Sequence, residues 1–317
     1  MPTPADAATP QPGSPQPGSP QQNAPEQGVI HDIGYRRYTG ARLGRGPVRT
    51  ALFLDTLRGC FGLGRAGKAK VMPAVLTAMV VLPALSVVFY ANVTGGTDLP
   101  FSYREYVGSI TTLVFIYVAG QAPQAVSRDL RFRTISLYFS RPIPRSDYVL
   151  AKFAAMSSAV MIFCVLPLLV LYIGALLAKM PVGEQTADFL KGLALALLFS
   201  LVVAGLGLVI ASVTPKRGFG VAAIVTVLLL ADSLAGVVIT VAEHQNNPTL
   251  SWYGGLLSPL YLVDSALAWV LSLDGGRLND QLPPDALGGL VFVAVLLAVI
   301  VGNYLLLNLR YRKVSVS

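Results

Sequence analysis

Charged residues are scarce in this chain of 317 residues: they make up 13% of it, whereas hydrophobic residues make up 54%. Soluble domains contain about 25% charged residues. The shortage of charge excludes an ordinary soluble enzyme and a fully disordered chain. It indicates instead a protein that crosses a membrane several times.

Cysteine and histidine are also rare, with two of each. Cys60 and Cys164 are too few for a disulfide framework, and neither His31 nor His244 has a further ligand at zinc-site spacing. No grouping of nucleophile, base or acid typical of an enzyme is present. The sequence therefore predicts no catalytic residue and no metal site.

One glycine-rich stretch, from Gly62 to Ala69, nearly matches the phosphate-binding loop of nucleotide-binding proteins. The match fails at Ala69, because that motif needs a Ser or Thr hydroxyl to bind magnesium, and no buried strand precedes it. We therefore expect this chain to bind no cofactor of its own.

Six hydrophobic runs are each long enough to cross a bilayer as a helix, which takes about 20 residues. We predict an all-α membrane protein with six transmembrane helices. The runs lie at about 71–93, 106–126, 153–178, 189–213, 219–242 and 287–309.

The positive charges define the orientation of these spans. The net charge is +8, and 20 of the 24 Lys and Arg residues fall on one side of the predicted membrane. Because cytoplasmic segments are rich in Lys and Arg, both termini are predicted to be cytoplasmic in a multi-pass protein of the cell membrane. The basic charge is thus explained by topology, and we predict no nucleic-acid partner.

Residues 250–273 form a further apolar stretch, but a seventh crossing would place the basic C-terminus outside. Gly254, Gly255 and Pro259 favour short helices in the outer leaflet before the last span. Asp264 in this stretch is interpreted, with the other external acidic residues, as a solvated loop charge.

The N-terminal part divides into two segments. Residues 1–28 contain eight of the 22 prolines and a tandem QPGSP repeat, and are predicted to form a disordered tail. Residues 29–70 are a basic cytoplasmic segment, in which 49–61 has the pattern of an amphipathic interfacial helix. The predicted six-span membrane domain then covers 71–309, and 310–317 form a basic cytoplasmic tail.

A few polar residues fall within the predicted spans. Asp232 lies near the middle of the fifth run, where a charge costs about 2.5–3.5 kcal/mol. It is either a proton relay or substrate contact, or a polar clasp between helices, with Ser233 or Asn303 as partner. Gln121 and Gln124 either line the cytoplasmic entrance of a pathway or simply pack.

The loop between the second and third runs, residues 127–152, combines arginines with two helix-stopping prolines. Its arginines either pair with acidic groups of a partner protein or only enforce topology and hold lipid phosphates.

This loop resembles the cytoplasmic loop of ABC-2-type transporter permeases. Matching positions are Asp129, Thr134, Leu137, Ser140, Pro142, Arg145 and Lys152, and residues 32–40 also look like a segment of bacterial permeases of this group. Arg133 and Ala151 depart from the pattern, since the family usually has glycine at both places.

The resemblance implies a permease subunit of an ATP-driven exporter, without enzymatic activity of its own. In that family the loop forms a coupling helix that docks on a separate ATPase subunit, which binds ATP and magnesium. The residues to which the resemblance assigns this docking are Arg128, Asp129, Arg131, Arg133, Thr134, Pro142, Arg145 and Lys152. The resemblance also implies a homodimer or a pair with a related permease. Two alternatives remain: a proton-coupled secondary transporter that uses Asp232, and a non-transporting membrane scaffold.

Overall fold

The computed structural model describes residues 44–64, 66–95, 98–126, 144–214, 216–272 and 286–314. These residues belong to one compact unit, Leu43–Ser317, and in the described ranges they form helices and no strand. The predicted disordered tail 1–28, residues 29–43 of the basic segment and most of the predicted docking loop lie outside the described residues.

Among the described residues, five helices are long and apolar enough to cross a membrane. They confirm five of the six predicted spans as helices of membrane length. The shortest of them has 27 residues, which extends about 40 Å, more than the roughly 30 Å of a hydrocarbon core. They are α2 (Lys68–Thr94), α7 (Arg145–Leu177), α8 (Val182–Val213), α9 (Arg217–His244) and α12 (Ala286–Val314).

The predicted span 106–126 differs from the others, because it is two helices, α3 (Tyr103–Ser109) and α4 (Thr111–Ala125). At the junction the Ser109 and Thr111 hydroxyls donate to the carbonyls of Tyr106 and Val107. Such side-chain bonds compete with the helix ladder. Backbone bonds from Ile110 to Tyr106 and from Val114 to Ile110 still bridge the junction. A crossing by α3 and α4 together stays a prediction.

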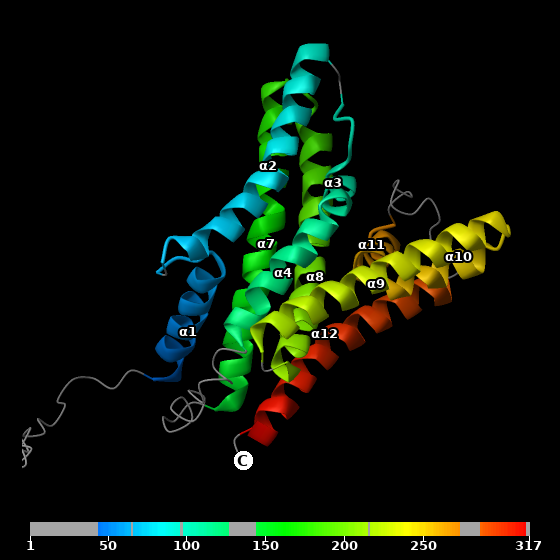
Figure 1. The fold of residues 1–317 in the computed structure, drawn as a ribbon. Coiled ribbons are helices and arrows are strands. Elements are labelled where there is room, and N and C mark those ends of the chain that lie inside the picture. Colours follow the sequence, from blue (N-terminus) through cyan, green and yellow to red (C-terminus); the bar gives the residue numbers. More distant parts are fainter. Residues whose placement is uncertain are drawn as a thin grey trace, which may run out of the picture. The chain divides into compact units, whose positions relative to one another are not determined.

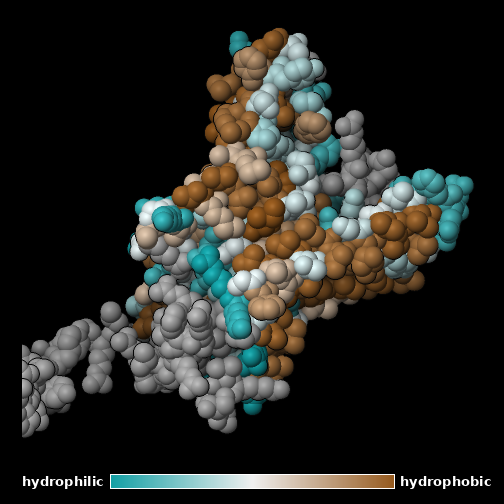
Figure 2. All heavy atoms as spheres, viewed as in Figure 1, coloured by the Kyte–Doolittle hydropathy of each residue, from teal (hydrophilic) through white to brown (hydrophobic). Residues whose placement is uncertain are grey.

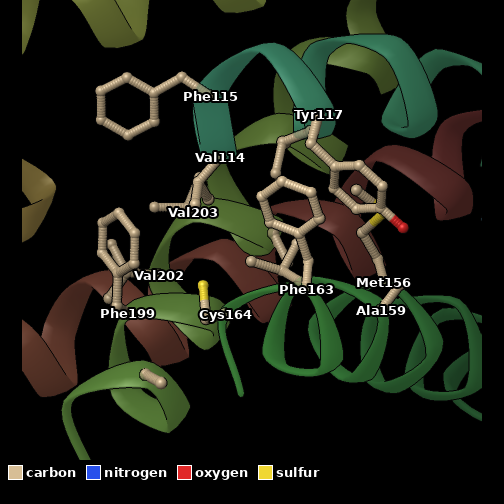
Figure 3. Packing of buried hydrophobic residues seen from close by; sticks show 14 of the residues in the cluster. Val114, Phe115, Tyr117, Met156, Ala159, Phe163, Cys164, Phe199, Val202 and Val203 are labelled. Atoms are coloured by element: carbon tan, nitrogen blue, oxygen red, sulfur yellow. The ribbon is translucent and has the colours of Figure 1, made fainter. Parts of the chain in front are cut away.

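The core lies around α7 and α8, which pack against each other (Figure 1). In their most apolar stretches 44% of α7 and 56% of α8 is buried, against 17–22% of α2, α9 and α12. Figure 3 shows the centre of this core, where Tyr117 of α4 stacks on Phe163 of α7 with ring centroids 4.7 Å apart. Cys164 and Phe199 lie in the same cluster.

The outer helices present hydrophobic side chains to the surroundings. Phe89 on α2 is 71% exposed and Val237 on α9 is 60% exposed. In Figure 2 a hydrophobic band follows α9 and ends in hydrophilic residues at the C-terminal end of that helix. A surface of this kind is stable only against lipid or another apolar surface.

A helix, α1 (Arg45–Cys60), occupies the position of the predicted amphipathic segment. Its buried side consists of Leu52, Thr56, Gly59 and Cys60, whereas Leu54, expected on the apolar face, is 44% exposed. The buried side packs against α7 and α4, so this helix uses part of its apolar surface inside the protein. Its place at the membrane interface stays a prediction.

The stretch before α12 forms the short helices α10 (Pro248–Gly254), η1 (Gly255–Leu257) and α11 (Pro259–Val270). Short helices were predicted here, and their outer-leaflet position stays a prediction. Nine of the twelve residues of α11 are buried. This helix packs against α8, α9 and α12.

Candidate functional site

A buried ion pair joins α3 to α11. Arg104 donates from Nε and Nη2 to Oδ1 of Asp264, at 2.9 and 2.6 Å. The Arg104 side chain is 11% exposed and the Asp264 side chain is 1% exposed. The sequence-based interpretation of Asp264 as a solvated loop charge is therefore wrong.

The correction has a physical cause. Asp264 lies on a helix whose other residues are almost all apolar, so packing of that helix removes the carboxylate from water. Burial raises the pKa of the Asp264 carboxyl, while the charge and hydrogen bonds of Arg104 oppose this rise. An ion so placed is tolerated because a cation is paired with it.

A second polar tie joins α9 to the beginning of α11. The Ser258 hydroxyl donates to Oδ1 of Asp232 at 2.6 Å. The same oxygen of Ser258 accepts from the backbone N–H groups of Leu260 and Tyr261, which makes Ser258 the N-cap of α11. The Asp232 carboxyl thus lies beside the N-terminal end of α11.

The partner of Asp232 is neither of the two residues considered from sequence. Ser233 is exposed. Asn303 is buried at 4% exposure and faces α8, where a side chain on Gly205 would meet its amide. The structure therefore gives Asp232 the geometry of a polar clasp between helices, with Ser258 as the other half.

The two ties converge on α11 from different helices. Asp232 of α9 is hydrogen-bonded to Ser258, the N-cap of α11. Arg104 of α3 is paired with Asp264, in the middle of α11. Displacement of α11 would break both ties and leave a buried carboxylate without its cation. The arrangement can therefore hold α11 in one position, and it provides two polar contacts that a conformational change would have to replace.

The glutamines lie near the end of α4. Gln121 is 1% exposed, its amide nitrogen is 3.9 Å from Sδ of Met72, and its carbonyl oxygen has no hydrogen-bond partner. Gln124 donates to the carbonyl of Gly120. The contacts described here take Gln121 to Met72 on α2 and Gln124 to Gly120 on α4, whereas Asp232 bonds to Ser258.

Two of the predicted docking residues are described. Arg145 begins α7, directly after Pro144, and is half-buried. Lys152 is 8% exposed, with Nζ 5.5 Å from the centre of the Tyr148 ring. Lys152 is therefore too buried to contact a docked subunit directly, and could affect docking only through its neighbours. The other six, Arg128, Asp129, Arg131, Arg133, Thr134 and Pro142, lie outside the described residues.

The end of this loop is tied to α1. Arg49 of α1 lies 3.9 Å from the carboxylate of Asp147 in the first turn of α7. The acidic Asp147 also suits the positive end of the α7 dipole. Because Asp147 lies within the predicted docking loop 127–152, the beginning of α7 is a point where α1 contacts that loop.

Arg104, Asp264 and Ser258 are the residues of this site that sequence reasoning missed. A single carboxylate within the apolar run 259–270 was a usable signal, because such a charge must be paired once the run is buried. Its partner lies 160 positions away, and no sequence pattern pointed to it. Within the described part of the chain no group of His, Cys, Asp and Glu could hold a metal ion.

Comparison with known proteins adds one finding. A family model described as ABC-2 family transporter protein matches residues 109–316, which is more than half of the chain. The match includes Asp232, Ser258 and Asp264, and four of the long helices, α7, α8, α9 and α12. No curated protein matches the chain.

Proposed function

Because the chain belongs to the ABC-2 family of transporter proteins, we propose that it is the permease subunit of an ATP-driven exporter. The observation that carries the proposal is the family match over residues 109–316 on a fold with five helices of membrane length. The permease supplies the substrate pathway, and a separate ATPase subunit binds ATP and magnesium. A homodimer, or a pair with a related permease, completes the membrane part.

The ATPase docks on the loop 127–152. Support comes from the basic residues of this loop, which can form bidentate pairs with acidic groups of a partner. Further support comes from the Arg49–Asp147 contact at the end of the loop, because it offers a route from the docked subunit to both α1 and α7. Movement of the ATPase would then shift these helices between two arrangements, a change driven by binding energy at the other subunit.

In this proposal α11 closes the outer side of the pathway. It is the buried short helix that both carboxylates restrain, and it lies in the segment predicted to be external. Asp232 then has a structural role, because its carboxylate already accepts a hydrogen bond from the buried Ser258 hydroxyl and so connects α9 to α11. This favours the ATP-driven permease over a secondary transporter that protonates Asp232 in each cycle.

Co-purification from native membranes with an ATP hydrolysis assay tests the docking. The variant carries Asp129→Ala, Arg131→Ala and Arg133→Ala, and the matched control carries Lys216→Ala and Arg217→Ala, which removes charge from another predicted cytoplasmic loop. We expect ATPase activity to accompany the normal chain and the control, and to be lost with the triple variant. Equal activity with all three would exclude docking on the loop, and absence of ATPase activity from the normal chain would remove the proposal itself.

A further inference from the structure

A groove of about 570 Å³ runs along α2 beside the connector from α1. This volume is within the range of ligand sites in proteins, about 300–1,000 Å³. Its lining is almost entirely apolar, with one charged residue, Lys70, at one end. The lining residues on α2 are Lys70, Pro73, Ala74, Thr77, Ala78, Val81 and Leu82, and those on the connector are Phe61 and Leu63.

The lining on α2 follows one helical stripe. Steps of three and four residues from Lys70 to Leu82 keep the side chains on the same face. Twelve residues of helix extend about 18 Å, and half of a hydrocarbon core is about 15 Å. The groove is therefore as long as one leaflet is deep, with its cation at the end from which α2 starts.

The shape of the groove depends on small side chains and on one glycine. Ala74, Thr77 and Ala78 are small lining residues on α2, called the floor of the groove below, and Phe61 and Leu63 line it from the connector. The connector can lie this close because of Gly62, whose φ is +69° and whose Cβ, if present, would be 2.5 Å from the carbonyl oxygen of Ala69. Any other residue at this position would both strain the backbone and clash with α2.

We propose that this groove binds one anionic phospholipid of the cytoplasmic leaflet, with an acyl chain along α2 and the phosphate at Lys70. The occupant is a lipid because the groove combines an apolar floor of leaflet length with a cation at the headgroup level. A soluble anion would use only Lys70 and leave the apolar floor uncovered. This site is separate from the ATPase docking and the α11 ties of the proposed function.

Charge, and not the acyl chain, gives the selectivity. Bilayer tails are as apolar as the groove, so burial of a chain there brings no hydrophobic gain over the membrane. A lysine at the surface attracts an anionic lipid by an amount that corresponds to about a fivefold preference over a neutral one. Lys68 is exposed on the same turn but does not line the groove, so it provides a matched control.

The test is native mass spectrometry of the full chain, released from bilayers of equal parts phosphatidylglycerol and phosphatidylcholine. We expect the normal chain to retain one lipid with about a fivefold preference for phosphatidylglycerol. Lys70→Gln should abolish this preference, so that the two lipids are retained equally, whereas Lys68→Gln should leave it unchanged. An equal loss in both variants would show diffuse surface attraction and overturn the proposal.

A second pair of variants tests the apolar part. Ala78→Phe fills the floor of the groove and should lower retention of both lipids several-fold, whereas Val75→Phe, on the exposed side of α2 outside the groove, should not. Unchanged retention in Ala78→Phe would place the lipid elsewhere. Displacement of the lipid by glycerol phosphate would indicate a site for a free anion. If the normal chain forms dimers without bound lipid and Ala78→Phe dissociates them, the occupant is a second copy of the chain. Both this result and displacement by glycerol phosphate overturn the proposal.

Discussion

At the scale of single residues, the Arg104–Asp264 pair is the strongest polar restraint on α11. Removing one partner of a buried pair leaves an uncompensated charge and costs about 3–5 kcal/mol, while replacing both with apolar residues is often nearly neutral. We therefore expect Arg104→Met to destabilise the protein strongly. Arg104→Met combined with Asp264→Leu should recover most of that loss. Thermal unfolding in detergent measures both.

The control for this prediction is the Lys191–Asp188 pair. Its atoms are as close, at 2.7 Å, but the two side chains are 37% and 48% exposed. Exposed pairs contribute about 0–1 kcal/mol, so Lys191→Met should change the unfolding temperature little. If Arg104→Met behaves like Lys191→Met, the ion pair does not hold α11.

Asp232 separates the two transport mechanisms that the sequence left open. Asp232→Asn keeps an oxygen that can accept from the Ser258 hydroxyl but removes the group that a proton relay needs. We expect transport by the variant, assayed in proteoliposomes with the partner ATPase and ATP, to stay within about tenfold of normal, because one neutral hydrogen bond is worth about 0.5–1.5 kcal/mol. A complete loss of transport, with folding intact, would favour proton coupling.

The residues also show where sequence reasoning is strong and where it is weak. Asp232 stood out because a charge in an apolar run is expensive wherever its partner is. Its partner Ser258 did not stand out, because serine is common and the contact depends on how the loop after α9 folds back. Asp264 was misjudged because it lies outside the six long runs, where charge is expected, and Arg104 was not singled out for the same reason.

At the scale of elements, the close packing of α8 on its neighbours explains why its second half contains small residues. A side chain on Gly207 would clash with Val118 of α4, and one on Gly205 would clash with Asn303 of α12. These glycines therefore allow α8 to approach two helices of its own chain. Helices and their apolar faces were predictable from composition, but the identity of the neighbours was not, because many helices in lipid offer equivalent apolar faces.

A matched pair of glycine substitutions tests this packing. Gly207→Ala should destabilise the protein by about 1–3 kcal/mol through overpacking. Gly236→Ala, in a helix site with no atom within 4 Å of the added carbon, should stabilise it by about 0.4–1 kcal/mol by restricting the unfolded chain. Opposite shifts in unfolding temperature are expected. Shifts of the same sign would mean that α8 does not pack closely on α4.

At the scale of the whole molecule, the number of crossings decides where the termini lie. Five helices in the described part of the chain have membrane length, and the predicted topology with six crossings assigns the remaining crossing to α3 and α4. The backbone bonds across Ile110 support this, because they leave few polar groups unpaired at the junction. The positive-inside pattern predicts the same topology from independent information.

Reporter proteins that are active on one side of the membrane test the topology. We expect fusions after Gly95 and after Val126 to report opposite sides, and a C-terminal fusion to report the same side as Val126. Fusion after His244 serves as the control and should agree with Gly95. Agreement between Gly95 and Val126 would mean that α3 and α4 return to the side from which they started.

The burial of both cysteines has a practical consequence for following the transport cycle. Cys60 is 2% exposed and Cys164 is fully buried, and they are the only thiols in the chain. Maleimide dyes should therefore leave the native protein nearly unlabelled. A pair of cysteines introduced on α1 and α11 could then carry fluorophores without replacing Cys60 or Cys164, and energy transfer between them would record whether these two helices move together during ATP hydrolysis.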